Sequence, residues 1–191
     1  MRIIAGEWRG RTLRAPKGEL TRPTTDRVRE SLMSSLSSAR GGFEGAVVLD
    51  AFAGSGALAL EALSRGAASA VLVECDREAQ RAVEANIAAC GCASRARLVR
   101  GDVIARPPMR SADGPYDLVF LDPPYVLEPD VVCGLLARWH EAGILASGAL
   151  VCYEHVQSAA REVDGALEAL GWEVRARRKY GKTGVAIVCA P

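Results

Sequence analysis

The sequence predicts an α/β fold built on a doubly wound, mostly parallel sheet. Short apolar runs rich in β-branched residues alternate with segments in which apolar residues recur at helical spacing. In the clearest example, residues 47–50 run into a turn that holds Gly54 and Gly56, and residues 57–63 then take up helical spacing. Such alternation is typical of a parallel sheet, and 191 residues with 49% hydrophobic content suit one domain of this class.

The same alternation continues along the chain. Further strands are expected at residues 70–74, 96–100, 116–121, 149–154, 173–177 and 185–189. Helices are expected at residues 77–90, 131–141 and 163–170. Residues 107–115 are expected to form a loop.

Residues 1–20 precede this pattern and alternate short extended pieces with turn residues. The turn residues are Gly6, Gly10, Pro16 and Gly18. We expect a β-hairpin extension over residues 1–20, ahead of a main domain over residues 21–191. A helix should open that domain, because residues 24–26 offer capping groups before an apolar helical stripe.

Basic residues gather near the amino terminus although the formal net charge is only +1. They are Arg2, Arg9, Arg11, Arg14, Lys17 and Arg22. A local patch of this kind suits the phosphate backbone of a nucleic acid, whereas the small net charge argues against a protein that coats nucleic acid. Arg9 and Arg11 would form the tip of an extension that binds nucleic acid; a packing flap is the alternative.

The glycine turn predicts a nucleotide site. Gly54 and Gly56 allow close approach of a ligand to the backbone, and the following helix offers free N–H groups. Asp50 ends one strand as an acceptor, and Glu74 ends the next, where it can accept both ribose hydroxyls of a nucleoside. Asp102, beyond a third strand, is placed to accept an adenine amino group. At this point NAD and S-adenosylmethionine both fit.

A second motif separates the two cofactors. The strand at residues 116–121 runs into Asp122-Pro123-Pro124-Tyr125, whose prolines stiffen the backbone. The Asp122 carboxylate and the Pro123 carbonyl can accept the two hydrogens of an exocyclic amine, while Tyr125 stacks on the ring that bears it. A dehydrogenase has no evident use for this arrangement, so the motif favours methyl transfer to an amine.

Three blocks in this order resemble the bacterial 16S ribosomal RNA guanine-N2 methyltransferase family. They are Thr-Arg-Pro-Thr-Thr-Asp-Arg-Val-Arg-Glu at residues 21–30, Asp-Ala-Phe-Ala-Gly-Ser-Gly at residues 50–56, and Asp-Pro-Pro-Tyr at residues 122–125. The resemblance covers nearly the whole chain. It implies a Rossmann-like class I methyltransferase sheet closed by an antiparallel pair, S-adenosylmethionine as the cofactor, and ribosomal RNA within the small ribosomal subunit as the partner.

Motif and resemblance together yield a set of expected site residues. The catalytic residues would be Asp122, Pro123 and Tyr125. The cofactor would contact Asp50, Phe52, Gly54, Gly56, Glu74, Cys75, Asp102, Val103 and Thr25. The RNA substrate would contact Pro124, Arg9, Arg11 and Arg14.

Other functions remain open on the residues themselves. The same acceptors suit DNA adenine-N6 or protein glutamine-N5 methylation, and a non-catalytic nucleic-acid-binding module of this fold is a further alternative. The six cysteines form no C-x-x-C pair and neither histidine lies at metal-ligand spacing, so we expect no metal. With no signal peptide and no long apolar span in the sequence, we expect a cytoplasmic monomer without membrane contact.

Overall fold

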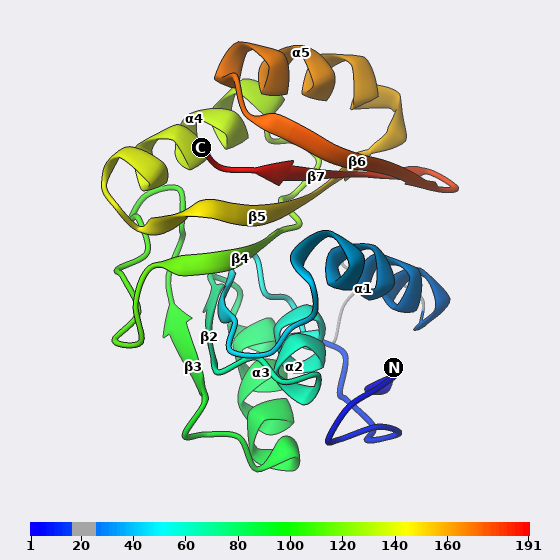
Figure 1. Cartoon of the computed structure of the whole chain (residues 1–191). Coiled ribbons are helices and arrows are strands. Elements are labelled where there is room, and N and C mark those ends of the chain that lie inside the picture. The colour runs from blue at the N-terminus through cyan, green and yellow to red at the C-terminus, as the bar shows by residue number, and fades with distance from the viewer. Residues whose placement is uncertain (17–25) are drawn as a thin grey trace.

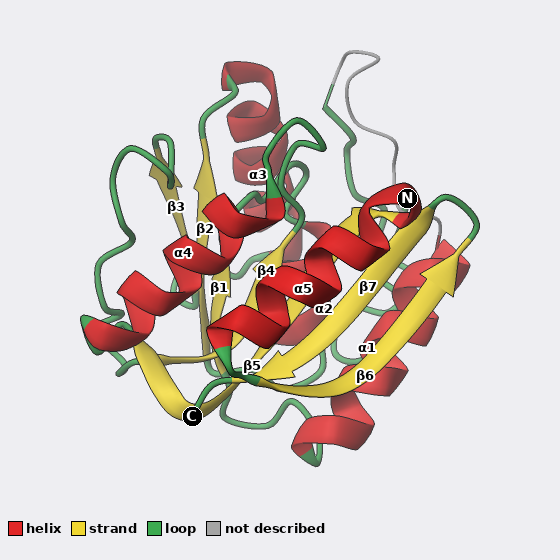
Figure 2. Cartoon of the chain, turned by 90° about the horizontal axis from the view of Figure 1, so that it is seen from above, coloured by secondary structure: helices red, strands yellow, loops and turns green. Residues whose placement is uncertain are grey.

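A seven-stranded sheet forms the centre of the molecule, and helices cover both of its faces (Figures 1 and 2). The structure is a computed structural model that describes residues 1–16 and 26–191. The strands are β1 Val47–Asp50, β2 Ser69–Glu74, β3 Ala96–Arg100, β4 Tyr116–Leu121, β5 Leu145–Val156, β6 Glu173–Tyr180 and β7 Thr183–Cys189. The helices are α1 Asp26–Arg40, α2 Ala57–Ser64, α3 Arg77–Cys90, α4 Pro129–Glu141 and α5 Ala160–Leu170.

The order of the strands in the sheet is β3-β2-β1-β4-β5-β7-β6. The first five are parallel, whereas β7 runs antiparallel to both β5 and β6. The chain moves outward from β1 to β3 and then crosses back to β4, so the order reverses between β1 and β4. Open α/β sheets bind ligands beyond the carboxyl ends of their strands at such a reversal.

Alternate residues of each strand pack into two different hydrophobic layers. In β1, Val48 lies in the layer beneath α1, α2 and α3, whereas Val47 and Leu49 lie in the layer beneath α4 and α5. Figure 1 shows α4 and α5 above the sheet and α1 on the opposite side. Strands buried on both faces explain why the predicted strands are almost continuously apolar.

Two strands exceed their predicted ranges by three residues or more. β5 begins at Leu145 with a register shift against β4, and β6 continues to Tyr180 before a turn at Gly181. The charged residues Arg178 and Lys179, which follow the predicted end of β6, are exposed. Because β6 is an edge strand, exposed charges there are compatible with strand structure.

Residues 1–16 fold back onto the main body of the chain. Arg2 and Thr12 form an isolated antiparallel bridge, and Ile3, Trp8 and Leu13 are buried against the core. Residues 17–20 of the expected hairpin lie outside the described residues. Among the helices that the structure describes, none is long and apolar enough to cross a membrane.

Candidate active site at the carboxyl ends of the strands

Acidic residues meet where the parallel strands end. Asp50 is the last residue of β1, Glu74 is the last residue of β2, and Asp122 follows β4 directly. The register pairs Asp50 with Leu72 of β2 and with Phe120 of β4, so the three carboxyl groups lie at one edge of the sheet. Side chains whose positions along the chain differ by 24 to 72 residues are thereby brought together.

The glycine turn between β1 and α2 has positive φ angles at both of its glycines, a conformation that favours glycine. Gly56 has a φ of 76° and precedes α2, and a Cβ added there would lie 2.8 Å from Leu72 Cδ2. Gly54 also has a positive φ, of 54°, but an added Cβ would meet no described atom within 4 Å. The turn is therefore packed against β2 at Gly56 and open at Gly54.

Glu74 holds this turn in place. Its Oε2 accepts a hydrogen bond from Gly54 N at 2.7 Å, and its Oε1 accepts one from Asp76 N at 2.8 Å. A carboxylate oxygen can accept a second hydrogen bond, so ribose hydroxyls could still bind here. The ribose role of Glu74 stays a prediction, and the structure adds a role in ordering the loop.

Asp50 is almost completely buried, with 2% of its surface exposed. Its Oδ2 accepts a long hydrogen bond of 3.4 Å from Ala59 N in the first turn of α2. Burial, together with the nearby carboxyls of Asp122 and Glu74, raises the pKa of Asp50 to about 7. A cationic group bound beside Asp50 would therefore favour its charged form.

Asp122, Pro123 and Tyr125 follow the end of β4, and their catalytic roles stay a prediction. Asp122 is half-buried, and burial raises its pKa to about 6. Pro123 is buried, whereas Tyr125 is 55% exposed and its hydroxyl lies 3.5 Å from Thr183 Oγ1 at the start of β7. The Tyr125 ring thus remains accessible for stacking, beside a rigid pair of acceptors.

The other expected cofactor residues surround the glycine turn and the strand ends. Asp102 is exposed and its Oδ1 accepts a hydrogen bond from Ile104 N at 2.9 Å, while Cys75 is exposed. Phe52 is partly buried and Val103 is fully buried, both against the layer beneath α4 and α5. Thr25 lies outside the described residues.

A cavity of about 230 Å³ adjoins the Asp-Pro-Pro-Tyr motif. Residues of the motif and of the loop that leads into α4 form one wall, and residues from β5, the turn after it and α5 form the rest. The residues that line it include Pro123, Pro124, Tyr125, Glu154, His155 and Glu162. The cavity is thus a concave surface in direct contact with the predicted catalytic residues.

Glu154 is a site residue that the sequence predicted only as part of a strand. It is 7% exposed, and its Oε2 has no hydrogen-bond partner among the described residues. Burial, with the neighbouring carboxyl of Asp122, raises the pKa of Glu154 to about 8. An acid closing an apolar run, as at Asp50 and Glu74, was the signal that could have identified it.

The amino-terminal segment is attached to α2 and α3 by buried polar groups. Glu61, which is fully buried, accepts hydrogen bonds from Ile4 N at 2.8 Å and Ala5 N at 3.1 Å. Asn86 of α3 exchanges hydrogen bonds with the backbone of Arg14 and also donates to the carbonyl of Ser55 at 2.8 Å. One amide thus links this segment to the glycine turn.

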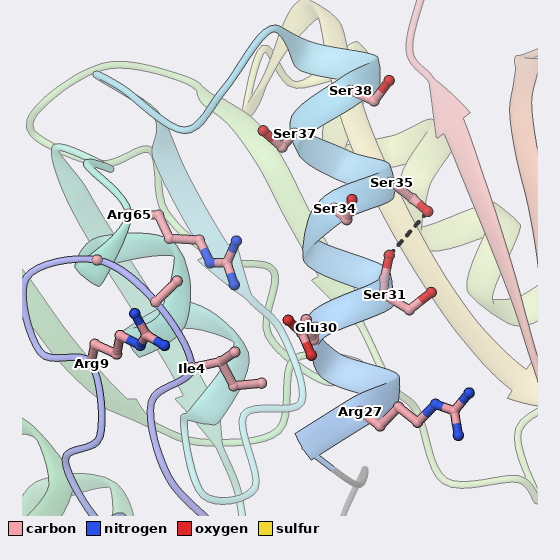
Figure 3. A pocket seen from close by; sticks show the side chains of 12 residues that line it. Ile4, Arg9, Arg27, Glu30, Ser31, Ser34, Ser35, Ser37, Ser38 and Arg65 are labelled. Atoms are coloured by element: carbon pink, nitrogen blue, oxygen red, sulfur yellow. Dashed lines mark hydrogen bonds between the residues drawn. The ribbon is translucent and has the colours of Figure 1, made fainter.

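The three expected RNA-binding arginines are separated along this segment. Arg9 lines an open groove of about 1150 Å³ between the segment and α1. Arg27 and several serines of α1 also line this groove (Figure 3). Arg11 donates a hydrogen bond to the carbonyl of Ala89, and Arg14 is exposed. Arg9 is the member of the three that contributes to a groove.

Among the described residues, no group of three or more histidine, cysteine, aspartate or glutamate side chains is arranged to hold a metal ion. The acids at the strand ends are instead spread along one edge of the sheet, as separate hydrogen-bond acceptors. Hydroxyl, ammonium and amine groups are the donors that such carboxyls accept from.

Comparison with known proteins identifies the family to which this chain belongs. The family model described as Conserved hypothetical protein 95 matches residues 1–189. Ribosomal RNA small subunit methyltransferase D of Escherichia coli (strain K12) is 45% identical over 125 residues, which are 65% of this chain and 60% of that protein. "Putative rRNA methyltransferase YlbH" of Bacillus subtilis (strain 168) is 37% identical over 98% of this chain and 97% of that protein.

A solved structure agrees with the sequence relatives. "Putative methyltransferase yhhF from Escherichia coli" superimposes with a TM-score of 0.79 at 34% identity, over 100% of this chain and 97% of that chain. The predicted Rossmann-like methyltransferase fold is thereby confirmed. The chain belongs to the Conserved hypothetical protein 95 family, and its relatives include proteins named as rRNA methyltransferases.

Proposed function

We propose that this protein transfers a methyl group from S-adenosylmethionine to the exocyclic N2 amine of a guanine in small-subunit ribosomal RNA. The observation that carries the proposal is the placement of Asp122, the Pro123 carbonyl and the exposed ring of Tyr125 beside the glycine turn. A planar base bearing an amine matches that set of groups. The names of the relatives support ribosomal RNA as the source of the base.

The residues around the turn fit S-adenosylmethionine. An added Cβ at Gly54 would point into open space, so a ligand can approach the backbone there. Glu74 would accept the ribose hydroxyls, Asp102 the adenine amine, and the carboxyl of Asp50 would face a cationic part of the cofactor. When bound, the cofactor supplies an electrophilic methyl group on a sulfonium, whose departure needs no acid.

The protein then has to make the amine nucleophilic. The lone pair of guanine N2 is delocalised into the ring, and it becomes available when the nitrogen is pyramidal. Asp122 and the Pro123 carbonyl would each accept one N–H and hold that geometry, and Asp122 or water would take the proton late. Tyr125 would stack on the base with about 1–3 kcal/mol.

The base has to leave its own stack to reach Tyr125, because a paired or stacked guanine hides N2 from the motif. We place the RNA backbone along the amino-terminal segment, with Arg9 in the groove of Figure 3 and Arg11 and Arg14 beside it. We propose that the shape of the ribosomal particle selects the target.

The experiment that tests this function offers labelled S-adenosylmethionine with three substrates in parallel: unmodified small ribosomal subunits, naked ribosomal RNA and duplex DNA. Digestion to nucleosides identifies the product. We expect N2-methylguanosine from ribosomal substrates alone, and the ratio of particle to naked RNA shows whether ribosomal proteins complete the target. Label in adenine of DNA, in glutamine of a protein, or nowhere would reject the guanine assignment.

A further inference from the structure

Glu154 lies beside Asp122 at the end of the neighbouring strand. The register of β4 and β5 pairs Leu121 with Tyr153, so the next residues on these two parallel strands, Asp122 and Glu154, are neighbours on one side of the sheet. β7 lies on the other side of β5 and pairs Val185 with Glu154. Glu154 is therefore enclosed laterally by the catalytic motif and by an apolar strand.

Burial of the Glu154 carboxyl costs free energy, and one of its oxygens has no hydrogen bond to the described residues that would offset this cost. Its Oε2 is buried and has no hydrogen-bond partner among the residues that the structure describes. A buried polar atom without a partner costs free energy, and its retention in a protein calls for an explanation. Because the carboxyl of Glu154 lies beside that of Asp122, a base held by Asp122 is the natural partner.

We propose that Glu154 recognises the guanine by pairing with its N1–H and C6=O, while Asp122 and Pro123 hold the N2 amine. This inference rests on the function proposed above and adds a residue that sets base specificity. Glu154 would be a specificity residue and not a proton acceptor from N2, since both N2 hydrogens already have acceptors.

The chemistry of the base supports a neutral carboxyl as its partner. Once both N2 hydrogens are bound, the remaining edge of guanine presents one donor, N1–H, next to one acceptor, O6. A protonated carboxyl group presents one acceptor next to one O–H donor, so the two edges are complementary. Adenine has an acceptor at N1 and an amine at C6, and it fits this group less well.

The surroundings of Glu154 keep it protonated near neutral pH. Burial is the main cause of its raised pKa, and the carboxyl of Asp122 adds to it. The other titratable groups on the same cavity wall are Tyr125, Glu128, Tyr153, His155 and Glu162. His155 uses its Nδ1 with the carbonyl of Val156 at 3.0 Å, and no lysine or arginine of the described chain lines this wall to favour a charged Glu154.

The test compares Glu154→Gln with Glu154→Ala in the complete protein. The amide of Gln also offers one acceptor and one donor but cannot lose a proton, so E154Q should keep kcat/KM for RNA within about threefold of wild type at pH 7. Wild-type kcat/KM should fall about tenfold between pH 7 and pH 9, as a group that titrates near pH 8 loses its proton. In E154Q this alkaline decline should be absent.

Glu154→Ala should lower kcat/KM about 10- to 100-fold, because it removes two hydrogen bonds to the base. Once the target nucleotide is mapped with wild type, RNA carrying 2-aminopurine at that position provides a second readout. This base retains the N2 amine but lacks N1–H and O6. The preference of wild type for guanine over 2-aminopurine should fall at least about tenfold in E154A, which a merely structural Glu154 would not cause.

Glu168→Gln is the matched control, because Glu168 is exposed on α5 and does not line the cavity. It should leave both the alkaline decline and the preference for guanine unchanged. An E154Q protein that is inactive, or that keeps the alkaline decline, overturns the inference while the methyltransferase activity stands. If wild type methylates no guanine, the proposed function fails first, and the inference falls with it before any variant is made.

Discussion

At the scale of single residues, the carboxyl groups at the strand ends lie in two different environments. Glu74 is bound to backbone N–H groups of the glycine turn, whereas Asp122 lies beside the cavity and the exposed Tyr125 ring. The first environment suits a ligand that must be held, and the second suits a group that must react. Substitution of each residue should therefore affect a different step.

Asp122→Ala should reduce methyl transfer by at least about 100-fold, because it removes an acceptor that positions and deprotonates the amine. Binding of S-adenosylhomocysteine should change little, since the glycine turn and Glu74 remain intact. Single-turnover transfer and calorimetric binding measure the two effects separately. Near-normal turnover in this variant would falsify the role assigned to Asp122.

Glu74→Ala should show the reverse pattern. Loss of its carboxylate removes the ribose acceptor and also frees the Gly54 N–H that it binds at 2.7 Å, so affinity for S-adenosylhomocysteine should fall about 10- to 100-fold. At saturating cofactor, most of the transfer rate should return. A variant with unchanged affinity would show that Glu74 orders the loop but does not contact the cofactor.

At the scale of elements, α2 serves both the cofactor turn and the amino-terminal segment. Its first residue follows Gly56, and its fully buried Glu61 binds Ile4 N and Ala5 N and forms ion pairs with Arg65 at 2.8 Å and Arg29 at 3.9 Å. Ser64, on the next turn, accepts from Trp8 N at 3.0 Å and donates to the carbonyl of Ala5 at 2.7 Å. These bonds fix residues 4–8 along the helix.

Glu61→Ala should destabilise the protein by about 2–5 kcal/mol, because it leaves two backbone N–H groups without their acceptor and removes an ion-pair partner of the buried Arg29, which keeps its ion pair with Asp26. Denaturant unfolding measures the loss, and limited proteolysis should now cleave within residues 1–16. Glu84→Ala is a suitable control, since Glu84 forms an exposed ion pair on α3. If E61A is as stable and as protease-resistant as this control, the segment is held by its apolar residues alone.

Strand and helix positions could be predicted from the sequence because the central strands β1 and β4 are buried on both faces and most helices have one apolar stripe. The strand-end residues Asp50, Glu74 and Asp122 followed from the same pattern. Glu154 also ends an apolar run, but its position beside Asp122 follows only from the register between β4 and β5, which the sequence does not reveal. Glu61 was missed because residues 1–16, distant in sequence, bury it.

At the scale of the whole molecule, three raised pKa values give stability a characteristic pH dependence. Asp50, Asp122 and Glu154 have pKa values of about 7, 6 and 8 in the folded protein, against ordinary values of 3.8 to 4.5. The folded state therefore binds more protons than the unfolded state between about pH 4 and pH 8. Their contribution to stability is fully present below that window and is lost as the pH rises through it.

The free energy of unfolding should fall by at least about 1 kcal/mol between pH 5 and pH 8 in the absence of ligand. Denaturant titrations across this range measure it. Glu154→Gln should flatten the curve above pH 6, whereas Glu162→Gln, which changes an exposed residue, should not. A stability that rises toward pH 8 would contradict the protonated state assigned to Glu154.

The basic amino-terminal segment should determine how RNA affinity depends on salt. Replacing Arg9 and Arg11 together by alanine should weaken binding of ribosomal RNA and reduce the slope of log K against log salt concentration by about 0.7–0.9 for each phosphate that is no longer neutralised. Arg161→Ala is the matched control, because Arg161 is exposed on α5 across the sheet. An unchanged slope in the double variant would mean that the segment packs but does not bind RNA.

The shortness of α2 limits where residues can be inserted into this chain. The helix has eight residues, of which Glu61 and Ser64 bind the amino-terminal segment, and Asn86 of α3 links the turn before the helix to Arg14. One residue inserted between Gly56 and Glu61 would rotate Glu61 by about 100° and carry it away from Ile4 and Ala5. This helix therefore has to keep its residue count, because it sets the distance between the turn proposed to hold the methyl donor and the segment proposed to bind the RNA.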